Sequence, residues 1–252
     1  MEATTFDPGI GREFIDRAQS LARHSDSPAH YTRTYLTPAH RAASRQIAEW
    51  MRAAGLAVRL DAVGSVIGRY EAAAPGAKTL LMGSHFDSVR NGGKYDGVLG
   101  ILVPIACVGE LQRRGERLAV AIEIAAFADE EGARFQTSFL ASRAMIEGSA
   151  SLSPLLDRRD ADGVVLREAM AGAGLEPARA DADRIDPESL AAYVEVHIEQ
   201  GPVLLNGGHA LGVVTSIAAG TRHLLRVKGE AGHAGTVPMA MRRDAMTAAA
   251  EM

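Results

Sequence analysis

Apolar and polar positions alternate along this chain in a way that predicts helices and strands in turn. Apolar residues recur at helical spacing over residues 11–23 and 39–54, and the second stretch stops at Gly55. Further strands are expected over residues 56–60, 65–70, 79–84, 119–127 and 192–198, and further helices over residues 97–114, 137–147 and 162–171. This alternation predicts an α/β fold with helices on both faces of a sheet.

A second unit is predicted to begin near residue 211. Residues 211–217 and 223–228 have the pattern of paired strands, and residues 244–252 have the pattern of a helix. The predicted domains are therefore residues 1–210 and residues 211–252.

Side chains that can bind metal follow three of the predicted strands. His85 comes just after one strand, Asp129-Glu130-Glu131 follows the next, and His197 lies near the end of a third. In α/β sheets, ligands bind at the carboxyl ends of the strands. We therefore expect these side chains to converge at one edge of the sheet.

Each of these residues also has an explanation without metal. A lone histidine such as His85 is usually a hydrogen-bonded polar residue, and Asp96 precedes a predicted helix that it could cap. Acidic runs are usually solvated, and His197 in an apolar strand is expected to be buried with a hydrogen-bond partner. However, Asp87 stands two residues after His85, where its carboxylate would accept the second imidazole N–H and orient the ring.

Imidazole and carboxylate ligands together suit zinc, manganese or a similar divalent ion, and one shared carboxylate can hold a pair of ions. Of two neighbouring carboxylates, one can bind metal while the other acts as a general base.

Composition excludes several other classes of function. Hydrophobic residues make up 47% of the 252 residues and charged residues 23%, as in an ordinary globular protein. The net charge of −4 gives no reason to expect a nucleic-acid or membrane partner. The single cysteine, Cys107, is expected to be a buried core thiol. The N-terminus has no apolar signal-peptide core, so a cytoplasmic location is expected.

Four motifs in order resemble one family. They are SHFDSVRNGGKYDG, DEEGARF, HIEQGPVL and GHAGTVPMAMRRDA. Together they resemble the amidohydrolase branch of the dinuclear zinc aminoacylase and carboxypeptidase superfamily, which includes allantoate amidohydrolase, N-carbamoyl-L-amino acid hydrolase and a type of β-ureidopropionase. The resemblance implies a zinc-peptidase-like mixed sheet, followed by the start of an inserted α+β lid or dimerisation domain.

The resemblance also implies two divalent metal ions per subunit, zinc or manganese. His85 and His197 would be terminal ligands of one ion, Asp96 would bridge both ions, and Glu131 would bind the second. Because family members are longer, their last ligand of the second ion is expected beyond residue 252, which leaves that site incomplete in this chain.

The remaining roles concern catalysis and substrate. Glu130 would be the base that passes a proton from water to the leaving nitrogen, and Asp87 would orient His85. Gln200 matches a position that contacts substrate. His233 matches a lid histidine that, in the family homodimer, stabilises negative charge in the neighbouring active site. The other five histidines, His40 among them, match no motif.

The resemblance implies hydrolysis of a ureido C–N bond in a small-molecule substrate, with release of ammonia and carbon dioxide. Allantoate is favoured, because YTRTYLTPAHRAA over residues 31–43 resembles bacterial proteins of that type more than it resembles the carbamoylases. N-carbamoyl-L-amino acid hydrolase and β-ureidopropionase are the alternatives. A dipeptidase or aminoacylase fits less well, because a carboxylate usually stands at the His197 position there. A further alternative is an inactive fragment that binds metal or dimerises.

Overall fold

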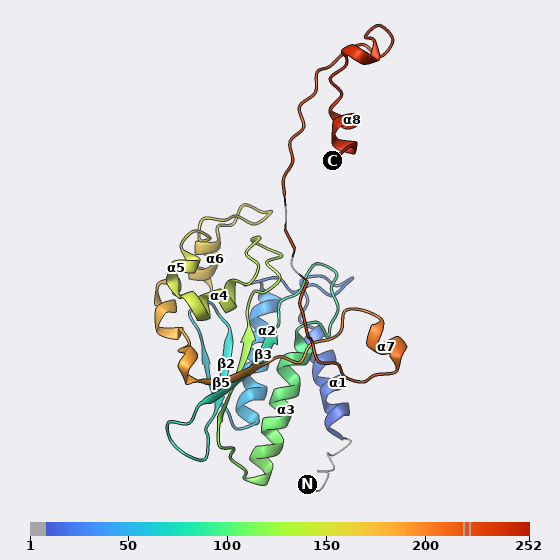
Figure 1. Ribbon diagram of the computed structural model, residues 1–252. Helices are drawn as coiled ribbons and strands as arrows, with labels where there is room; N and C mark the ends of the chain where they lie inside the picture. Colours follow the sequence, from blue (N-terminus) through green and yellow to red (C-terminus); the bar gives the residue numbers. More distant parts are fainter. Residues whose placement is uncertain (1–8, 219, 222) are drawn as a thin grey trace. The chain divides into compact units, whose positions relative to one another are not determined.

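The computed structural model describes residues 9–218, 220–221 and 223–252 (Figure 1). The chain forms two compact units, Met1–Gln200 and Gly201–Met252, and each is described by itself. The predicted domains, residues 1–210 and 211–252, stay a prediction, since compactness alone does not identify a lid.

The first unit is built on a five-stranded mixed sheet in the order β1-β2-β4-β3-β5. Strand β2 runs antiparallel to both β1 and β4, whereas β3 runs parallel to both β4 and β5. The strands are β1 (Ala57–Leu60), β2 (Val66–Tyr70), β3 (Thr79–His85), β4 (Ala121–Phe127) and β5 (Leu190–Val194).

The parallel strands bring their carboxyl ends to the same edge of the sheet. Helix α3 (Val98–Arg114) connects β3 to β4, as a crossover between parallel strands requires. The last residues of these two strands, His85 and Phe127, are paired in register. The loops after β3, β4 and β5 therefore all leave the sheet at one edge, as the sequence predicted.

Three long helices contact one another, and two of them pack on the sheet. Helix α1 (Gly9–Ala22) contacts α3, and α2 (Pro38–Ala53) contacts α3, β1 and β2 (Figure 1). Thr37 is the N-cap of helix α2, and its side chain accepts a hydrogen bond from the His40 amide. The helix ends just before Gly55, which has a positive φ of 90°.

Helix α3 corrects the prediction for Cys107. The buried stripe of this helix contains Val98, Ile101, Leu102, Ile105 and Val108. Cys107 lies outside that stripe and is exposed. The prediction of a buried thiol was wrong, because the helix is apolar on more than the face it buries.

Shorter helices add to the same hydrophobic core. These are α4 (Leu140–Glu147), α5 (Ser149–Leu152), α6 (Leu166–Gly172) and the 3₁₀ helices η1 (Pro177–Asp183) and η2 (Pro187–Ser189). Buried side chains of α4, α5 and α6 belong to one core cluster with those of the sheet. Neighbouring residues of β4, such as Ile124 and Ala125, point to opposite faces and are both fully buried. The sheet is thus covered on both faces at its centre, which confirms the predicted α/β class.

Strand β5 is shorter and more exposed than the sequence predicted. It ends at Val194 rather than at residue 198, and most of its residues are exposed at the edge of the sheet. Its side chains Tyr193 and Val194 are 47% and 43% exposed. The apolar composition predicted a buried strand here. An edge strand has a neighbouring strand on one side only, so it is less covered than a central strand.

The second unit has little regular structure. It contains α7 (Val203–Gly207), the 3₁₀ helix η3 (Met239–Met241) and α8 (Ala245–Ala250). The helix predicted from residue 244 is confirmed, and Asp244 caps it through the amides of Met246 and Thr247.

The two paired strands predicted in this unit do not form among the described residues of 211–217 and 223–228. Their apolar side chains are exposed, Val213 by 91% and Leu224 by 83%. A lone two-stranded ribbon buries too little apolar surface to offset the cost of ordering it. Within the described part of the chain, no helix combines the length and apolar character needed to cross a membrane.

Candidate metal centre

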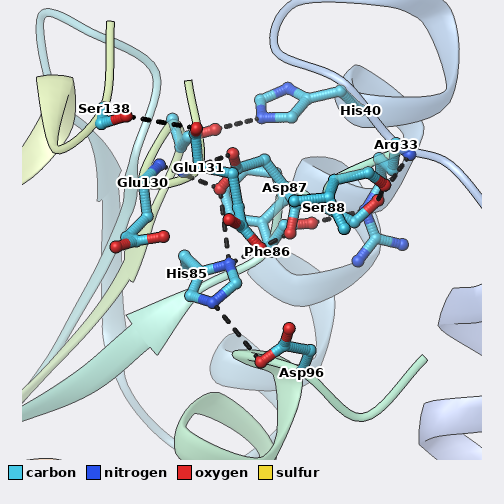
Figure 2. Close-up of polar contacts among 12 residues, drawn as sticks. Arg33, His40, His85, Phe86, Asp87, Ser88, Asp96, Glu130, Glu131 and Ser138 are labelled. Carbon is cyan, nitrogen blue, oxygen red and sulfur yellow. Dashed lines mark hydrogen bonds and ion pairs between the residues drawn. The ribbon is translucent and has the colours of Figure 1, made fainter. Parts of the chain in front are cut away.

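His85 is the last residue of β3, and its imidazole is buried. Its Nδ1 lies 3.0 Å from the main-chain oxygen of Asp87, so in the neutral ring Nδ1 carries the hydrogen and Nε2 keeps a free lone pair. Nε2 lies 4.0 Å from Oδ1 of Asp96 (Figure 2). Burial alone would lower the pKa of His85, but the carboxylates of Asp87 and Glu130 outweigh it and raise that pKa to about 9. A metal ion that binds Nε2 must therefore displace a proton.

His197 presents the same ring nitrogen to the same carboxylate. Its Nδ1 lies 2.9 Å from the main-chain oxygen of Ile198, and its Nε2 lies 3.3 Å from Oδ1 of Asp96. His197 was predicted to be buried within a strand, and this was wrong. It follows the end of β5 and is exposed, because the chain leaves the sheet at Val194. The atoms of His85, Asp96 and His197 that could bind an ion all lie within 4.8 Å of one another.

Asp96 does not cap the helix that follows it. The N-cap position of α3 is Gly97, and no side chain of the described residues caps this helix. The Asp96 carboxylate instead accepts hydrogen bonds from Nε2 of Gln200, at 3.0 and 3.1 Å. The explanation of Asp96 as an N-cap is therefore not realised. Gln200 lies next to the candidate ligands, and its predicted contact with substrate stays a prediction.

Gly97 allows Asp96 and α3 to approach His85. Its φ is +66°, and a Cβ at this position would lie 2.3 Å from the main-chain oxygen of His85 and 2.6 Å from its Nε2. A larger residue would push into the histidine ring, so glycine is needed here on two grounds.

The loop after β4 provides a second group of possible ligands. Ligand atoms of His85, Glu130 and Glu131 all lie within 4.8 Å of one another. Burial raises the pKa of both glutamates. The sequence paired Glu131 with Asp96 at the second ion, whereas this group contains His85 and Glu130 in place of Asp96. The assignment of Glu131 to a second ion stays a prediction.

Asp87 joins the loops after β3 and β4. Its side chain is 1% exposed, and its two carboxylate oxygens accept the amide hydrogens of Glu130 at 3.0 Å and of Glu131 at 3.1 Å. Asp87 also contacts His85, through its main-chain oxygen at 3.0 Å and through Oδ1 at 3.5 Å. That Asp87 orients His85 stays a prediction, and the contacts that would serve it come from the Asp87 main chain as well as from its carboxylate, which also accepts the two glutamate amides.

The segment after the glutamates folds back onto them. Asp129 is buried and accepts the Thr137 hydroxyl at 2.6 Å, and its pKa is raised to about 8 by burial and by the nearby charge of Asp87. The amide of Phe139 donates to the main-chain oxygen of Glu130 at 2.8 Å. Phe139 has a positive φ of 62°, and for this reason α4 begins at Leu140 rather than at residue 137.

His233 lies in the second unit, in a turn that presents one ring nitrogen. The Gly235 amide donates to its Nδ1 at 3.1 Å, so Nε2 carries the hydrogen in the neutral ring and is a donor. Arg242 supports this turn by donating to the main-chain oxygens of Val237, at 2.9 Å, and of Ala234. The structure describes His233 only within its own unit.

Two buried residues near the site carry no motif. Arg33 is fully buried and donates from Nε to the main-chain oxygen of Phe86 at 2.5 Å. His40 contacts both the Phe86 ring and the Ala128 main chain. No local pattern could have revealed either role, because both residues act on residues far along the chain.

The chemistry of these side chains fits divalent metal ions. Two imidazoles, whose Nε2 atoms face Asp96, and three carboxylates converge from three strand ends. This is the nitrogen and oxygen donor set that zinc and manganese accept. The site therefore has candidate ligands, a candidate base in Glu130, and a fixed loop that carries that base.

Comparison with known proteins places this site in a family. The sequence pattern of peptidase family M20/M25/M40 matches residues 76–252. An allantoate deiminase from Arabidopsis thaliana is 43% identical over 247 residues, which cover 95% of this chain and 46% of that protein. An N-carbamoyl-L-amino acid amidohydrolase from Geobacillus stearothermophilus is 46% identical over 244 residues, which cover 96% of this chain and 59% of that protein.

A solved structure has the same fold. The amidase of the hydantoinase/carbamoylase family from Burkholderia phymatum superposes with a TM-score of 0.77 at 32% identity, covering 100% of this chain and 59% of that one. This chain therefore spans about half the length of the curated relatives it matches. The matched pattern covers most of the chain, including every candidate metal ligand, and the chain therefore belongs to peptidase family M20/M25/M40.

Proposed function

We propose that this chain contributes the metal site of an amidohydrolase that cleaves a ureido or carbamoyl C–N bond. The observation that carries the proposal is the convergence of His85, Asp96 and His197, from three separate parts of the chain, beside Glu130 and Glu131. The names of the two relatives, an allantoate deiminase and an N-carbamoyl-L-amino acid amidohydrolase, support this class of reaction.

His85, Asp96 and His197 would hold one divalent ion, and Asp96 with Glu131 would contribute to a second. When bound, the ions polarise the substrate carbonyl and lower the pKa of water. Glu130 takes a proton from the attacking water and delivers it to the leaving nitrogen. Its raised pKa suits this exchange, because a base with a pKa nearer to neutral can also give the proton back.

Allantoate is the substrate we propose first, and an N-carbamoyl-L-amino acid is the second. The second is retained because the relative with that activity is 46% identical and the allantoate deiminase is 43% identical, so identity does not separate the two. The resemblance over residues 31–43 favours allantoate. Arg33 and His40 of that segment are buried, at 0% and 2% exposure, so these two side chains give no separate support for an allantoate site.

The full-length protein is proposed to be a homodimer in which His233 serves the partner's active site. Its Nε2 is a hydrogen-bond donor when the ring is neutral, as a group that stabilises a developing oxyanion must be. Gln200, which lies on Asp96, is proposed to contact the substrate.

The test is ammonia release by the 252-residue chain reconstituted with zinc or manganese, with a chelator as control. Allantoate, an N-carbamoyl-L-amino acid and β-ureidopropionate are compared side by side, and a version extended to the length of the relatives is assayed in parallel. Chelator-sensitive release from any of them supports the reaction class. Failure of both versions on all three substrates contradicts it.

A further inference from the structure

His40 is a buried histidine that belongs to none of the motifs. It lies in the first turn of α2 and is 2% exposed. Its ring stacks on Phe86, with centroids 4.4 Å apart and planes at 26°, and meets Tyr35 edge-on at 5.5 Å and 88°. Phe86 stands between His85 and Asp87 in the chain. His40 therefore packs against the first residue of the loop that follows β3.

The same ring makes one hydrogen bond, and this bond reaches the loop that follows β4. Nε2 lies 2.7 Å from the main-chain oxygen of Ala128 (Figure 2). Because a carbonyl only accepts, Nε2 carries the hydrogen, and Nδ1 has no partner among the described residues. Burial lowers the pKa of His40 to about 4, so the ring is neutral near pH 7. His40 is thus a fixed neutral donor.

These two contacts join the loops that carry the candidate site. Ala128 directly precedes Asp129-Glu130-Glu131. The loops are also tied by the Phe86 amide, which donates to Phe127 at 3.1 Å, and by the Asp87 carboxylate. Without the His40 donor, the Ala128 carbonyl would be buried and unpaired, which is unfavourable enough to shift the loop towards another donor.

We propose that His40 is a positioning residue that sets Glu130 and Glu131 against His85 by donating its Nε2 hydrogen to the Ala128 carbonyl. This inference rests on the proposed function for its effect on catalysis. If His40 only filled the core, it would be equally buried, but removal of its Nε2–H donor would leave Glu130 and Glu131 in place.

Two substitutions test the aromatic ring and the N–H donor of His40 separately. His40→Phe keeps an aromatic ring beside Phe86 and removes the N–H. His40→Gln removes the ring, but its Nε2 is the same number of bonds from Cα and can donate to Ala128. His24→Phe is the control, because it makes the same change at a histidine whose ring contacts Gln46, at 3.2 Å, and not Ala128 or Phe86.

The first measurement is hydrogen exchange of the Glu130 and Glu131 amides, which needs no activity. Manganese or zinc titration and the separate values of kcat and KM follow. We expect His40→Phe to speed exchange at least tenfold and to lower kcat by about 10- to 100-fold, with KM changed less than about threefold. His40→Gln and His24→Phe are expected to stay within about threefold of the unsubstituted chain.

Unchanged exchange in a folded His40→Phe chain would overturn the proposal, as would equal damage from both His40 substitutions. If His40→Phe does not fold, His40→Gln decides: protected glutamate amides support positioning, and tenfold faster exchange refutes it. If the unsubstituted chain neither binds metal nor turns over substrate, the proposed function fails. The exchange rates then still decide whether His40 positions the loop.

Discussion

Replacing Asp87 by asparagine tests whether one buried carboxylate fixes the glutamate loop. Each carboxylate oxygen accepts one backbone amide, from Glu130 at 3.0 Å and from Glu131 at 3.1 Å. Asparagine has the same shape but offers one neutral acceptor, and its NH₂ group would face the other amide. Both the loop and its glutamates should therefore become less ordered.

The size of the effect follows from these two bonds. A hydrogen bond to a charged group contributes about 1.5–3 kcal/mol, and leaving a buried donor unpaired costs about 1–3 kcal/mol. Loss of the Asp87 charge also relieves its repulsion of buried Asp129, which offsets part of the cost. We expect a net loss of about 2 kcal/mol in the free energy of unfolding without metal, and a 10- to 100-fold loss of metal affinity.

Urea unfolding at pH 7 and calorimetric metal titration measure the two effects. Asp183→Asn is the matched control, because Asp183 also accepts a backbone amide, from Ala62 at 2.8 Å, but belongs to neither group of candidate ligands. The control should lose some stability and keep its metal affinity. If Asp87→Asn stays within about 0.5 kcal/mol of the unsubstituted chain and binds metal equally well, the carboxylate does not fix the loop, and the reasoning is refuted.

Three further predictions concern the base, the glycine beside His85 and pH. Glu130→Gln should abolish ammonia release, while the metal affinity measured by titration stays within about threefold of the unsubstituted chain. Residual turnover would show that Glu130 is not the base. Gly97→Ala should lower metal affinity at least about tenfold, because its Cβ would lie 2.6 Å from His85 Nε2, whereas Gly115→Ala, with a similar φ of +67° and open space, should not. Burial raises the pKa of Asp61 from 3.8 to about 6. The folded state therefore holds this proton more tightly than the unfolded state, and its contribution to stability is lost as pH rises from about 4 to 6, by at most about 3 kcal/mol. Asp61→Asn should flatten this part of the curve of unfolding free energy against pH, and an unchanged slope would assign the effect to other carboxyls.

Local sequence patterns were sufficient for most elements of the first unit. Apolar runs located β3 and β4, helical spacing located α1 and α2, and Gly55 marked the end of α2. These features depend on side-chain periodicity and turn chemistry, which act over a few residues. The convergence of the histidines and carboxylates was also predictable, because strands that are parallel must end at the same edge.

Burial and pairing were decided by distant parts of the chain. His197 was expected inside a buried strand, but β5 lies at the edge of the sheet and ends at Val194. Residues 211–217 have an alternating pattern, yet their described side chains find no surface to cover them. An apolar pattern indicates that a segment can pack against another surface, but only the tertiary structure shows whether such a surface is present.

The sequence by itself thus determined which residues could bind metal and where along the chain they stand. It did not determine what holds them. Asp96 could have capped a helix, and only the fold shows its carboxylate beside two Nε2 atoms and Gln200. His40 acts on Ala128 across 88 residues, and Asp87 acts on Glu130 across 43. Such contacts form only when the sheet brings separate loops together, so the sequence supplied the ligands and the tertiary structure decided their geometry.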